Sequence, residues 1–291
     1  MKKTTCIIEV IIVFLLLKLF SMWLDYVLVK SGANSGWRTF LFGIQGIVIP
    51  LAIIALSKRK WSDYGFSFIN KKQLIHYGFI GAMLMLLLGL GFGYLKSQGI
   101  STSGRTGSLI LSSIASLMIL LFVCFSRNKK QKKVGKKKIR IRVFYQMAIL
   151  SVMVACPIIV ASIRGGDVTG IIAWDFYFLF MVGFGEEIKF RGYFQSRINE
   201  EYGHPWKFFG LSFGPGLIIV SLLFGLSHIA QFGVFNPFLG QYHLNPWMGL
   251  QATLGGFFYG IIREKSKSII SSGIAHGVPN VFGQVLAMAL K

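Results

Sequence analysis

Nine apolar runs, separated by short polar or charged stretches, dominate this chain of 291 residues. Each run comes close to the roughly 20 residues that a helix needs to cross the hydrocarbon core of a bilayer. Lipid admits only helices and closed barrels, and none of the runs shows the two-residue alternation of a barrel strand. The sequence therefore predicts an all-α, polytopic transmembrane helix bundle. The runs lie near residues 6–29, 37–57, 75–95, 107–126, 143–163, 171–195, 209–230, 246–262 and 268–290.

The number of crossings is expected to be about eight, because the last runs are shorter and interrupted by glycine and polar residues. Composition agrees with this class, since 54% of the residues are hydrophobic. Charged residues make up 14%, against roughly 25% in soluble domains. The first run, from Cys6 to Val29, is too long for the apolar region of a signal peptide, which predicts an uncleaved first span.

Two smaller features are assigned to helix packing. Glycines four residues apart allow helices to approach closely, and such pairs occur at Gly89/Gly93 and Gly256/Gly260. The three cysteines show no metal-binding spacing and are expected to be packing residues. They are Cys6, Cys124 and Cys156.

Positive charge gathers between the apolar runs and gives the chain a formal net charge of +21. The densest cluster lies at 127–142, after the fourth run. Lys2, Lys3 and the stretch 58–72 fall on the same side as this loop if each early run crosses once, which predicts a cytoplasmic N-terminus. We expect the loop to contact anionic lipid rather than nucleic acid. Short basic loops and compact length favour a multi-pass protein of a bacterial cell membrane.

The basic loop also marks the expected division of the chain. Residues 1–142 would form N-terminal spans and a basic cytoplasmic loop, and residues 143–291 would form the domain that carries the chemistry. The acidic residues of the first four spans are Glu9 and Asp25, near the ends of the first. A proton-coupled transporter would scatter ionisable residues through both halves, so this class is disfavoured.

Two adjacent carboxylates, Glu186 and Glu187, interrupt the apolar stretch 176–194. A charged group in the middle of a bilayer costs roughly 2.5–3.5 kcal/mol on insertion scales, so such residues are functional candidates. Arg191 follows Glu187 by four residues and can pair with it on one helix face. Glu186, rotated about 100° around the helix, is left freer and suits a general base. A buried ion-pair cluster that only fixes helix packing is the alternative.

Histidines at the ends of two later runs complete the set of candidates. His228 ends an apolar run, and His276 precedes Asn280 by four residues. Pro279 removes a backbone donor before Asn280, so the last helix should either begin near Val278 or kink there. The remaining histidines lie beside polar or loop sequence and are left without a functional role. These are His76, His204 and His243.

Three motifs in order carry a resemblance to a known family. They are Glu186-Glu187-Ile-Lys-Phe-Arg191 (EExxxR), Phe224-Gly-Leu-Ser-His228 (FxxxH) and His276-Gly-Val-Pro-Asn280 (HxxxN). Together, on successive apolar segments, they resemble the CPBP (CAAX protease and bacteriocin-processing, Abi) family, which includes Rce1-type CAAX prenyl endopeptidases. The resemblance covers roughly residues 170–290. It implies an intramembrane endopeptidase acting on a membrane-embedded or lipidated peptide or protein, in CAAX-type or bacteriocin and leader-peptide processing.

The resemblance also implies roles for the motif residues. Glu186 would activate water, and His228 would hold and polarise that water. His276 and Asn280 would donate hydrogen bonds to the oxyanion. Glu187 and Arg191 would fix the helix and tune Glu186.

Two other catalytic types compete with activation of water by glutamate alone. Glu186, His228 and His276 could bind zinc with one open position, although the chain has no HExxH motif. We favour no cofactor, with a divalent metal such as zinc as the alternative. The segment Gly210-Leu-Ser-Phe-Gly214 matches GxSxG, but a nucleophile elbow requires a strand and none is expected here, so Ser212 is disfavoured.

A non-catalytic membrane protein, such as an immunity factor or scaffold, is the competing class. The complete set of motif residues favours an enzyme over it. Simple spans would place Glu186 near mid-bilayer but His228 at the far end of its span. The motif segments must therefore tilt, break or re-enter to bring the residues together.

Overall fold

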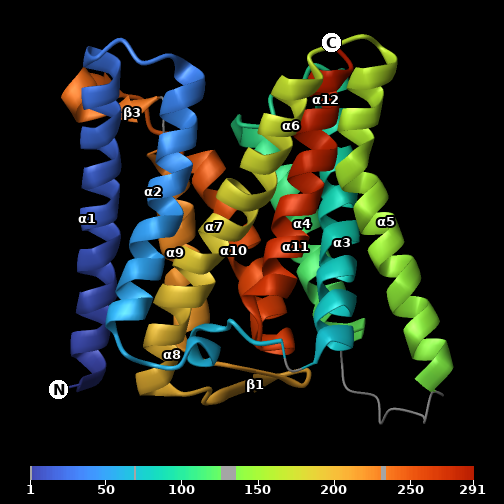
Figure 1. The fold of residues 1–291 in the computed structure, drawn as a ribbon. Coiled ribbons are helices and arrows are strands. Elements are labelled where there is room, and N and C mark those ends of the chain that lie inside the picture. Colours follow the sequence, from blue (N-terminus) through green and yellow to red (C-terminus); the bar gives the residue numbers. More distant parts are fainter. Residues whose placement is uncertain (1, 69, 126–135, 231–233) are drawn as a thin grey trace.

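The computed structural model describes residues 2–68, 70–125, 136–230 and 234–291, and it confirms an all-α bundle. Figure 1 shows the helices along one common direction, with the N-terminus at one end of the bundle and the C-terminus at the other. The first five helices are α1 (Lys2–Lys30), α2 (Ser35–Leu56), α3 (Lys71–Ser97), α4 (Arg105–Phe125) and α5 (Lys136–Ile163). Three more are α9 (Pro215–Ile229), α10 (Pro246–Ser266) and α11 (Ile269–Asn280).

A continuous helical stretch of 35 residues, 168–202, lies between α5 and α9. It changes repeatedly between α and π geometry, and such π segments are frequent at functional sites. Its parts are α6 (Val168–Phe176), the π-helix η2 (Tyr177–Phe184), α7 (Gly185–Glu187), the π-helix η3 (Ile188–Gln195) and α8 (Ser196–Tyr202). The last helix changes in the same way, because α11 continues into the π-helix η5 (Val281–Val285) and α12 (Leu286–Ala289).

Within the described residues, six helices are long and apolar enough to cross a membrane: α1 to α5 and the stretch 168–202. The protein is therefore an integral membrane protein. The expected total of about eight spans stays a prediction, as does the division of the chain at residue 142. Asparagine and aspartate side chains at the starts of these helices accept backbone N–H groups, which fixes where the helices begin. Examples are Asn34 for α2, Asn70 for α3 and Asp167 for α6.

Short strands also occur, which corrects the expectation that the run 209–230 is helical throughout. Leu211–Phe213 forms strand β2, which pairs antiparallel with β1 (Trp206–Phe208), and the helix α9 begins only at Pro215. The hairpin β1–β2 lies across the end of the bundle near the N-terminus (Figure 1). A second small hairpin and two 3-10 turns complete the fold. These are β3 (Phe235–Asn236), β4 (Gln241–Tyr242), η1 (Trp61–Tyr64) and η4 (Pro237–Leu239).

The end of the bundle that holds the N-terminus also holds the connection from α2 to α3 and the start of α5 (Figure 1). Lys58, Lys60 and Lys71 lie in or beside that connection. The structure thus brings these basic residues to one end, as the charge pattern predicts. Residues 126–135 of the predicted lipid-binding loop lie outside the described residues, and the cytoplasmic orientation stays a prediction.

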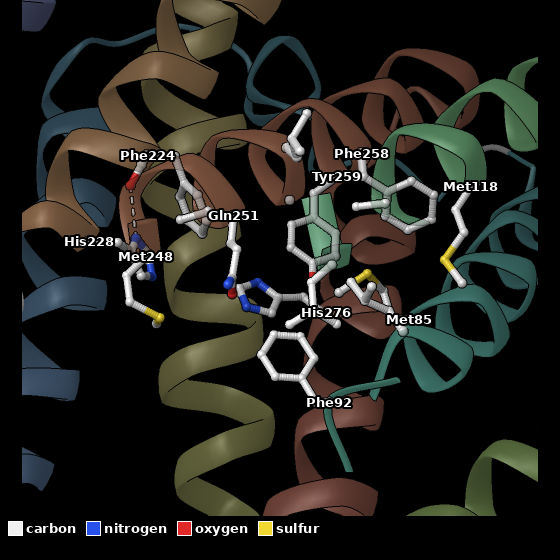
Figure 2. Close-up of a pocket in the computed structure, with 16 residues that line it drawn as sticks. Met85, Phe92, Met118, Phe224, His228, Met248, Gln251, Phe258, Tyr259 and His276 are labelled. Atoms are coloured by element: carbon white, nitrogen blue, oxygen red, sulfur yellow. Dashed lines mark hydrogen bonds between the residues drawn. The ribbon is translucent and has the colours of Figure 1, made fainter. Parts of the chain in front are cut away.

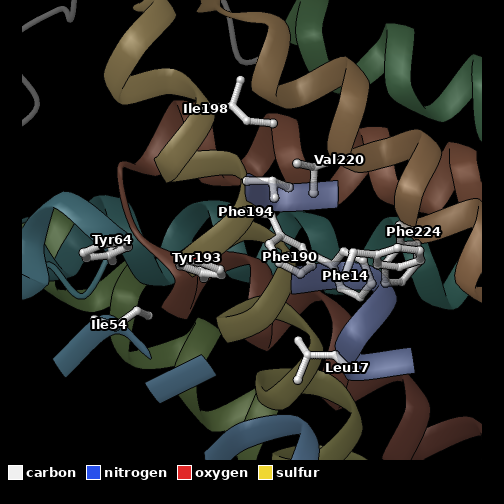
Figure 3. Close-up of a cluster of buried hydrophobic side chains, with 11 residues drawn as sticks. Phe14, Leu17, Ile54, Tyr64, Phe190, Tyr193, Phe194, Ile198, Val220 and Phe224 are labelled. Carbon is white, nitrogen blue, oxygen red and sulfur yellow. The ribbon is translucent and has the colours of Figure 1, made fainter. Parts of the chain in front are cut away.

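A cluster of buried aromatic side chains joins α1 to the stretch 168–202 (Figure 3). Phe190 packs edge-on against Phe194, and both rings contact Phe14 of α1. Phe190 also meets Phe224 of α9 with ring centroids 4.9 Å apart. Because Phe190 follows the glutamate pair by three residues, this cluster holds the pair at a fixed depth in the bundle.

Candidate active site

The centre of the site is a fully buried ion pair between Glu187 and Arg191. The side chains of both residues are 0% exposed, and Arg191 Nη1 donates to Glu187 Oε1 at 3.0 Å. Arg191 Nη2 donates to the backbone oxygen of Gly256 in α10 at 3.0 Å. The pairing at i and i+4 that the sequence predicts is therefore present, and it also fastens the stretch 168–202 to α10.

Three aromatic rings surround the Arg191 guanidinium. Its central carbon lies 4.5 Å from the ring centroid of Phe224, 5.4 Å from that of Tyr259 and 5.8 Å from that of Phe190. A ring face attracts a cation, and the attraction is stronger where water is excluded. The phenylalanine of the FxxxH motif thus helps to stabilise the arginine of the EExxxR motif.

His276 of α11 lies between the two glutamates. Its Nδ1 is 3.2 Å from Glu187 Oε1, and its Nε2 is 3.9 Å from Glu186 Oε2. The imidazole stacks on the ring of Tyr259, with centroids 4.3 Å apart and an angle of 14° between the planes. Sequence reasoning missed Tyr259, because nothing in its local sequence distinguishes it from other aromatic residues of a membrane helix.

His228 lies at the end of α9, and the short length of that helix explains how it reaches the site. A helix of 15 residues rises about 22 Å, less than the hydrocarbon core, so α9 ends inside the bundle. The expectation that the motif segments tilt, break or re-enter in the membrane stays a prediction. His228 Nδ1 lies 2.8 Å from the backbone oxygen of Phe224, which leaves Nε2 as the free ring nitrogen. Glu186 lies within electrostatic range of both His228 and His276.

Lys18 of α1 forms hydrogen bonds to the end of α9. Its Nζ donates to the backbone oxygen of Ser227 at 3.0 Å and also to that of Ala230. The last carbonyl groups of a helix have no partner within the helix, and inside a membrane they need a donor from elsewhere. Sequence reasoning missed Lys18, although a lysine inside an apolar run is the same signal that identified Glu186.

An apolar chamber of about 190 Å³ opens beside the two histidines (Figure 2). His228 and His276 line it, together with Phe224, Tyr259 and Gln251. Its other walls come from α3, α4 and α10, including Met85, Phe92, Ala115, Met118, Met248 and Phe258. Gln251 Nε2 donates to Ser108 Oγ and to the backbone oxygen of Thr102, which ties α10 to the start of α4. The chamber offers apolar volume directly next to the polar groups of the site.

Asn280 lies one helical turn after His276 on α11, and its side chain is bonded to a neighbour on the same helix. It is the last residue of α11, and its Oδ1 accepts from Gln284 Nε2 at 3.3 Å. Within the described part of the chain, its side chain makes no hydrogen bond to His276, His228 or Glu186. Pro279 lies inside α11, ten residues after the helix begins at Ile269. Of the two alternatives, a helix that begins near Val278 is therefore wrong, and a kink there stays a prediction. The chain passes into π geometry immediately after Asn280.

The proposed zinc ligands do not form a metal site in this arrangement. Across the described residues, no three His, Cys, Asp or Glu side chains lie close enough together to hold an ion. The 3.9 Å separation of His276 Nε2 and Glu186 Oε2 is the nearest approach between two of the proposed ligands that the structure records. His228 has its Nδ1 against a carbonyl and its Nε2 free, which is the arrangement in which a histidine binds a metal. The choice between zinc and metal-free chemistry at Glu186, His228 and His276 therefore stays a prediction.

Ser212 is not placed as a nucleophile. The expectation that no strand occurs there is wrong, because Ser212 is the middle residue of β2 and pairs with Lys207. A nucleophile elbow places its serine on the turn between strand and helix, and here that turn is occupied by Gly214 and Pro215. The hairpin also lies at the end of the bundle, away from α7 (Figure 1).

The remaining histidines have structural partners or face outward. His76 Nδ1 bonds Gln146 Nε2 at 2.9 Å, which joins α3 to α5. His204 Nε2 lies 2.9 Å from Glu264 Oε2 at the end of α10. His243 is exposed. None of the three contacts Glu186.

Comparison with known families agrees with the geometry. The sequence model of the family described as type II CAAX prenyl endopeptidase Rce1-like matches residues 169–282. Over this segment the chain is similar to the Rce1-like family. No curated protein and no solved structure gives a significant match to the chain.

The Rce1-like segment contains all three motifs and implies that the protein is a protease. It covers less than half of the chain, from α6 to η5. Lys18 and the α3 and α4 walls of the chamber lie outside it. The N-terminal helices therefore add to an Rce1-like site parts that the family match does not include.

Proposed function

We propose that this Rce1-like protein is an intramembrane endopeptidase in which Glu186 activates water without a metal ion. One observation carries the proposal: Glu186 Oε2 lies 3.9 Å from Nε2 of His276, and His276 lines the apolar chamber. Glu186 is 26% exposed, whereas Glu187 behind it is fully buried and bound to Arg191. The two adjacent carboxylates thus occupy different environments, which suits two different roles.

In the proposed reaction, Glu186 takes a proton from water as the water oxygen attacks the scissile carbonyl carbon. Glu186 Oε2 has no hydrogen-bond partner among the described residues, so this oxygen is free to accept that proton. When the tetrahedral intermediate collapses, the C–N bond breaks and the protonated Glu186 returns the proton to the leaving amine. Glu187 keeps His276 oriented through Nδ1, as the third member of a catalytic triad orients its histidine.

Stabilisation of the oxyanion falls to His228 and His276, which line the chamber. Each must be protonated to donate from Nε2, because its Nδ1 already faces a carbonyl or carboxylate oxygen. One correctly placed donor typically contributes about 2.7–4 kcal/mol to this step. Asn280 accepts from Gln284 through Oδ1, so its Nδ2 group is still able to donate a hydrogen bond to the oxyanion.

The proposed substrate is a membrane-associated peptide with an apolar group close to the scissile bond. The matched family is named for CAAX prenyl endopeptidases, whose substrates carry a prenylated cysteine near the C-terminus. The chamber has the apolar walls that such a group needs, and it adjoins His228 and His276. Processing of a bacteriocin or leader peptide would use the same site.

The test is cleavage of membrane-anchored peptides, one of them a prenylated CAAX peptide, by the protein reconstituted in liposomes. Wild type is compared with Glu186→Gln and with the control Glu200→Gln, which changes a half-exposed glutamate of the same helical stretch. We expect turnover that Glu186→Gln reduces by at least 1,000-fold, that Glu200→Gln leaves nearly unchanged, and that a chelator does not inhibit.

The outcomes separate the candidates. Turnover lost to the chelator and restored by zinc would show a metalloprotease and overturn the metal-free reaction. No turnover from folded protein on any peptide, or turnover indifferent to Glu186→Gln, would favour a non-catalytic immunity or scaffold role.

A further inference from the structure

A line of buried polar side chains runs along the helical stretch 168–202, from the active site towards α8. Its members recur every four residues: Glu187, Arg191, Gln195 and Asn199. Four residues of an α-helix turn about 400°, which is about 40° beyond a full circle, so an unbroken α-helix would carry the later members off one face. The π-helix η3, which begins directly after Glu187, has wider turns that take more residues each and offset this drift. The π geometry therefore keeps the line on one face.

Groups at the same spacing on α10 receive this line. Arg191 Nη2 donates to the backbone oxygen of Gly256 at 3.0 Å, and Gln195 Nε2 donates to that of Gly260 at 3.5 Å. Gly260 leaves room for the second contact, because a Cβ atom there would lie 3.0 Å from Gln195 Oε1. The next position at this spacing on α10 is Glu264.

Glu264 collects donors from both helices. Its side chain is 0% exposed. Its Oε1 accepts from Gln195 Nε2 at 2.7 Å and from Asn199 Nδ2 at 2.6 Å. Its Oε2 lies 2.9 Å from His204 Nε2 and 3.5 Å from Arg263 Nη1. A buried charge is costly unless it is paired and hydrogen-bonded, so Glu264 requires these donors to stay in place.

The line connects Glu264 to the carboxylates of the active site. Glu187 and Asn199 are twelve residues apart, which is about 18 Å along a helix. Successive residues of a helix are rotated by about 100°, so a shift of one residue in this stretch would exchange the environments of Glu186 and Glu187. Glu186 would then no longer lie opposite His276. The bonds to Glu264 oppose such a shift, because it would turn Gln195 and Asn199 away from α10.

We propose that Glu264 is a positioning residue, which fixes the rotation of the helical stretch 168–202 and so keeps Glu186 opposite His276. The kinetic test of this inference rests on the endopeptidase function proposed above. Glu264 does not line the chamber, whose wall from α10 ends at Tyr259 and whose other walls include α3 and α4. Its loss should therefore reduce kcat much more than it raises KM.

The first experiment exchanges the two groups of one hydrogen bond. Glu264→Gln should lower kcat by about 10- to 100-fold, as expected for a misplaced catalytic group, and should change KM by less than about threefold. The double variant Gln195→Glu, Glu264→Gln restores an amide–carboxylate bond with the roles reversed, and it should recover most of the rate. Asn199 Oδ1, which has no partner among the described residues, can accept from the new amide. The control Glu200→Gln changes a half-exposed carboxylate of the same stretch and should keep the wild-type rate.

Binding of a non-cleavable prenylated peptide counts the folded molecules, so that kcat is expressed per competent enzyme. A purely structural role would lower that count and leave kcat per competent molecule unchanged, which would overturn the proposal. A double variant as slow as Glu264→Gln would overturn it as well. If Glu264→Gln does not fold, Gln195→Met removes one donor of the same bond and should show the same loss of kcat at nearly constant KM.

Cross-linking measures the position of Glu186 without turnover. The native cysteines are replaced by alanine, and Glu186→Cys and His276→Cys are joined by a short bifunctional thiol reagent. Adding Glu264→Gln should slow the cross-link by about fivefold or more, since the rotation of the helix is released. Adding Gln195→Glu as well should restore the rate, and equal rates in all three proteins would overturn the proposal. Absence of cleavage together with the expected cross-linking would count against the protease and leave the positioning role standing.

Discussion

Gly183 and Gly277 face each other at the closest crossing beside the active site. A Cβ atom added to Gly183 would lie 2.4 Å from Gly277 Cα and 2.8 Å from Gly277 N. Backbone atoms cannot move aside as a flexible side chain can, so both positions require glycine. The crossing lies three residues before Glu186 and directly after His276, and it therefore sets the distance between the carboxylates and the imidazole.

Substitution Gly183→Ala should separate the two helices and lower kcat by at least 100-fold. The reason is geometric, since a shift of about 1 Å in a catalytic group can reduce the rate by that factor. Gly89→Ala is the matched control, because nothing lies within 4 Å of a Cβ atom at Gly89. Cleavage rates of the two variants, measured beside their thermal stability, test the prediction. Equal activity of Gly183→Ala and Gly89→Ala would show that the crossing does not set the site.

The Glu187–Arg191 pair should be far more sensitive to loss of one partner than to loss of both. Glu187→Gln leaves a guanidinium that is 0% exposed without its counter-ion, and breaking a buried pair in this way typically costs about 3–5 kcal/mol. The double variant Glu187→Gln, Arg191→Met removes both charges and should recover part of that loss. Unfolding free energies of the single and double variants in detergent measure the coupling. Additive losses would mean that the two charges do not stabilise each other.

The sequence predicted the local relationships of the site well. Glu187 and Arg191 lie on one helix four residues apart, so helical geometry alone brings them together. The meeting of Glu186 with His228 and His276 followed from the order of the motifs, not from any local rule. His228 reaches the site because α9 ends early, and His276 reaches it because Gly183 and Gly277 let their helices cross closely. Neither feature can be read from the hydropathy of the sequence.

Other features of the structure could not be predicted from the sequence pattern. The spacing of four at Gly89/Gly93 predicts a helix contact, yet nothing lies within 4 Å of either position, whereas Gly256 meets Ser221 as expected. A spacing shows that two glycines share a face but not whether that face meets protein or lipid. The π geometry around the glutamates has no sequence signature either. Lys18 is different, because a rule for intramembrane charge applied to cations would have found it.

Lys18 should act on catalysis through the end of α9. Lys18→Met leaves the carbonyls of Ser227 and Ala230 without their donor, and an unsatisfied buried acceptor costs about 1–3 kcal/mol. We expect kcat to fall by roughly tenfold or more, with a smaller change in KM, and Lys18→Arg to retain most of the rate. Ser21→Ala is the control, since Ser21 is on the same helix but bonds Gln45 of α2. A rate loss as large in Ser21→Ala would indicate a general effect of α1 packing.

The chamber beside the histidines should determine which apolar group the enzyme accepts. Ala115 of α4 lines the chamber, so Ala115→Phe places a large ring inside a volume of about 190 Å³. Leu117→Phe adds a ring two residues away on the same helix, where the side chain is 57% exposed and faces away from the protein. For a prenylated peptide, Ala115→Phe should lower kcat/KM by at least tenfold, mainly through KM, while Leu117→Phe should have little effect. For the same peptide without its prenyl group, the two variants should differ by less than a factor of three. If Ala115→Phe impairs both peptides equally, the chamber supports the fold of the site and does not bind the apolar group.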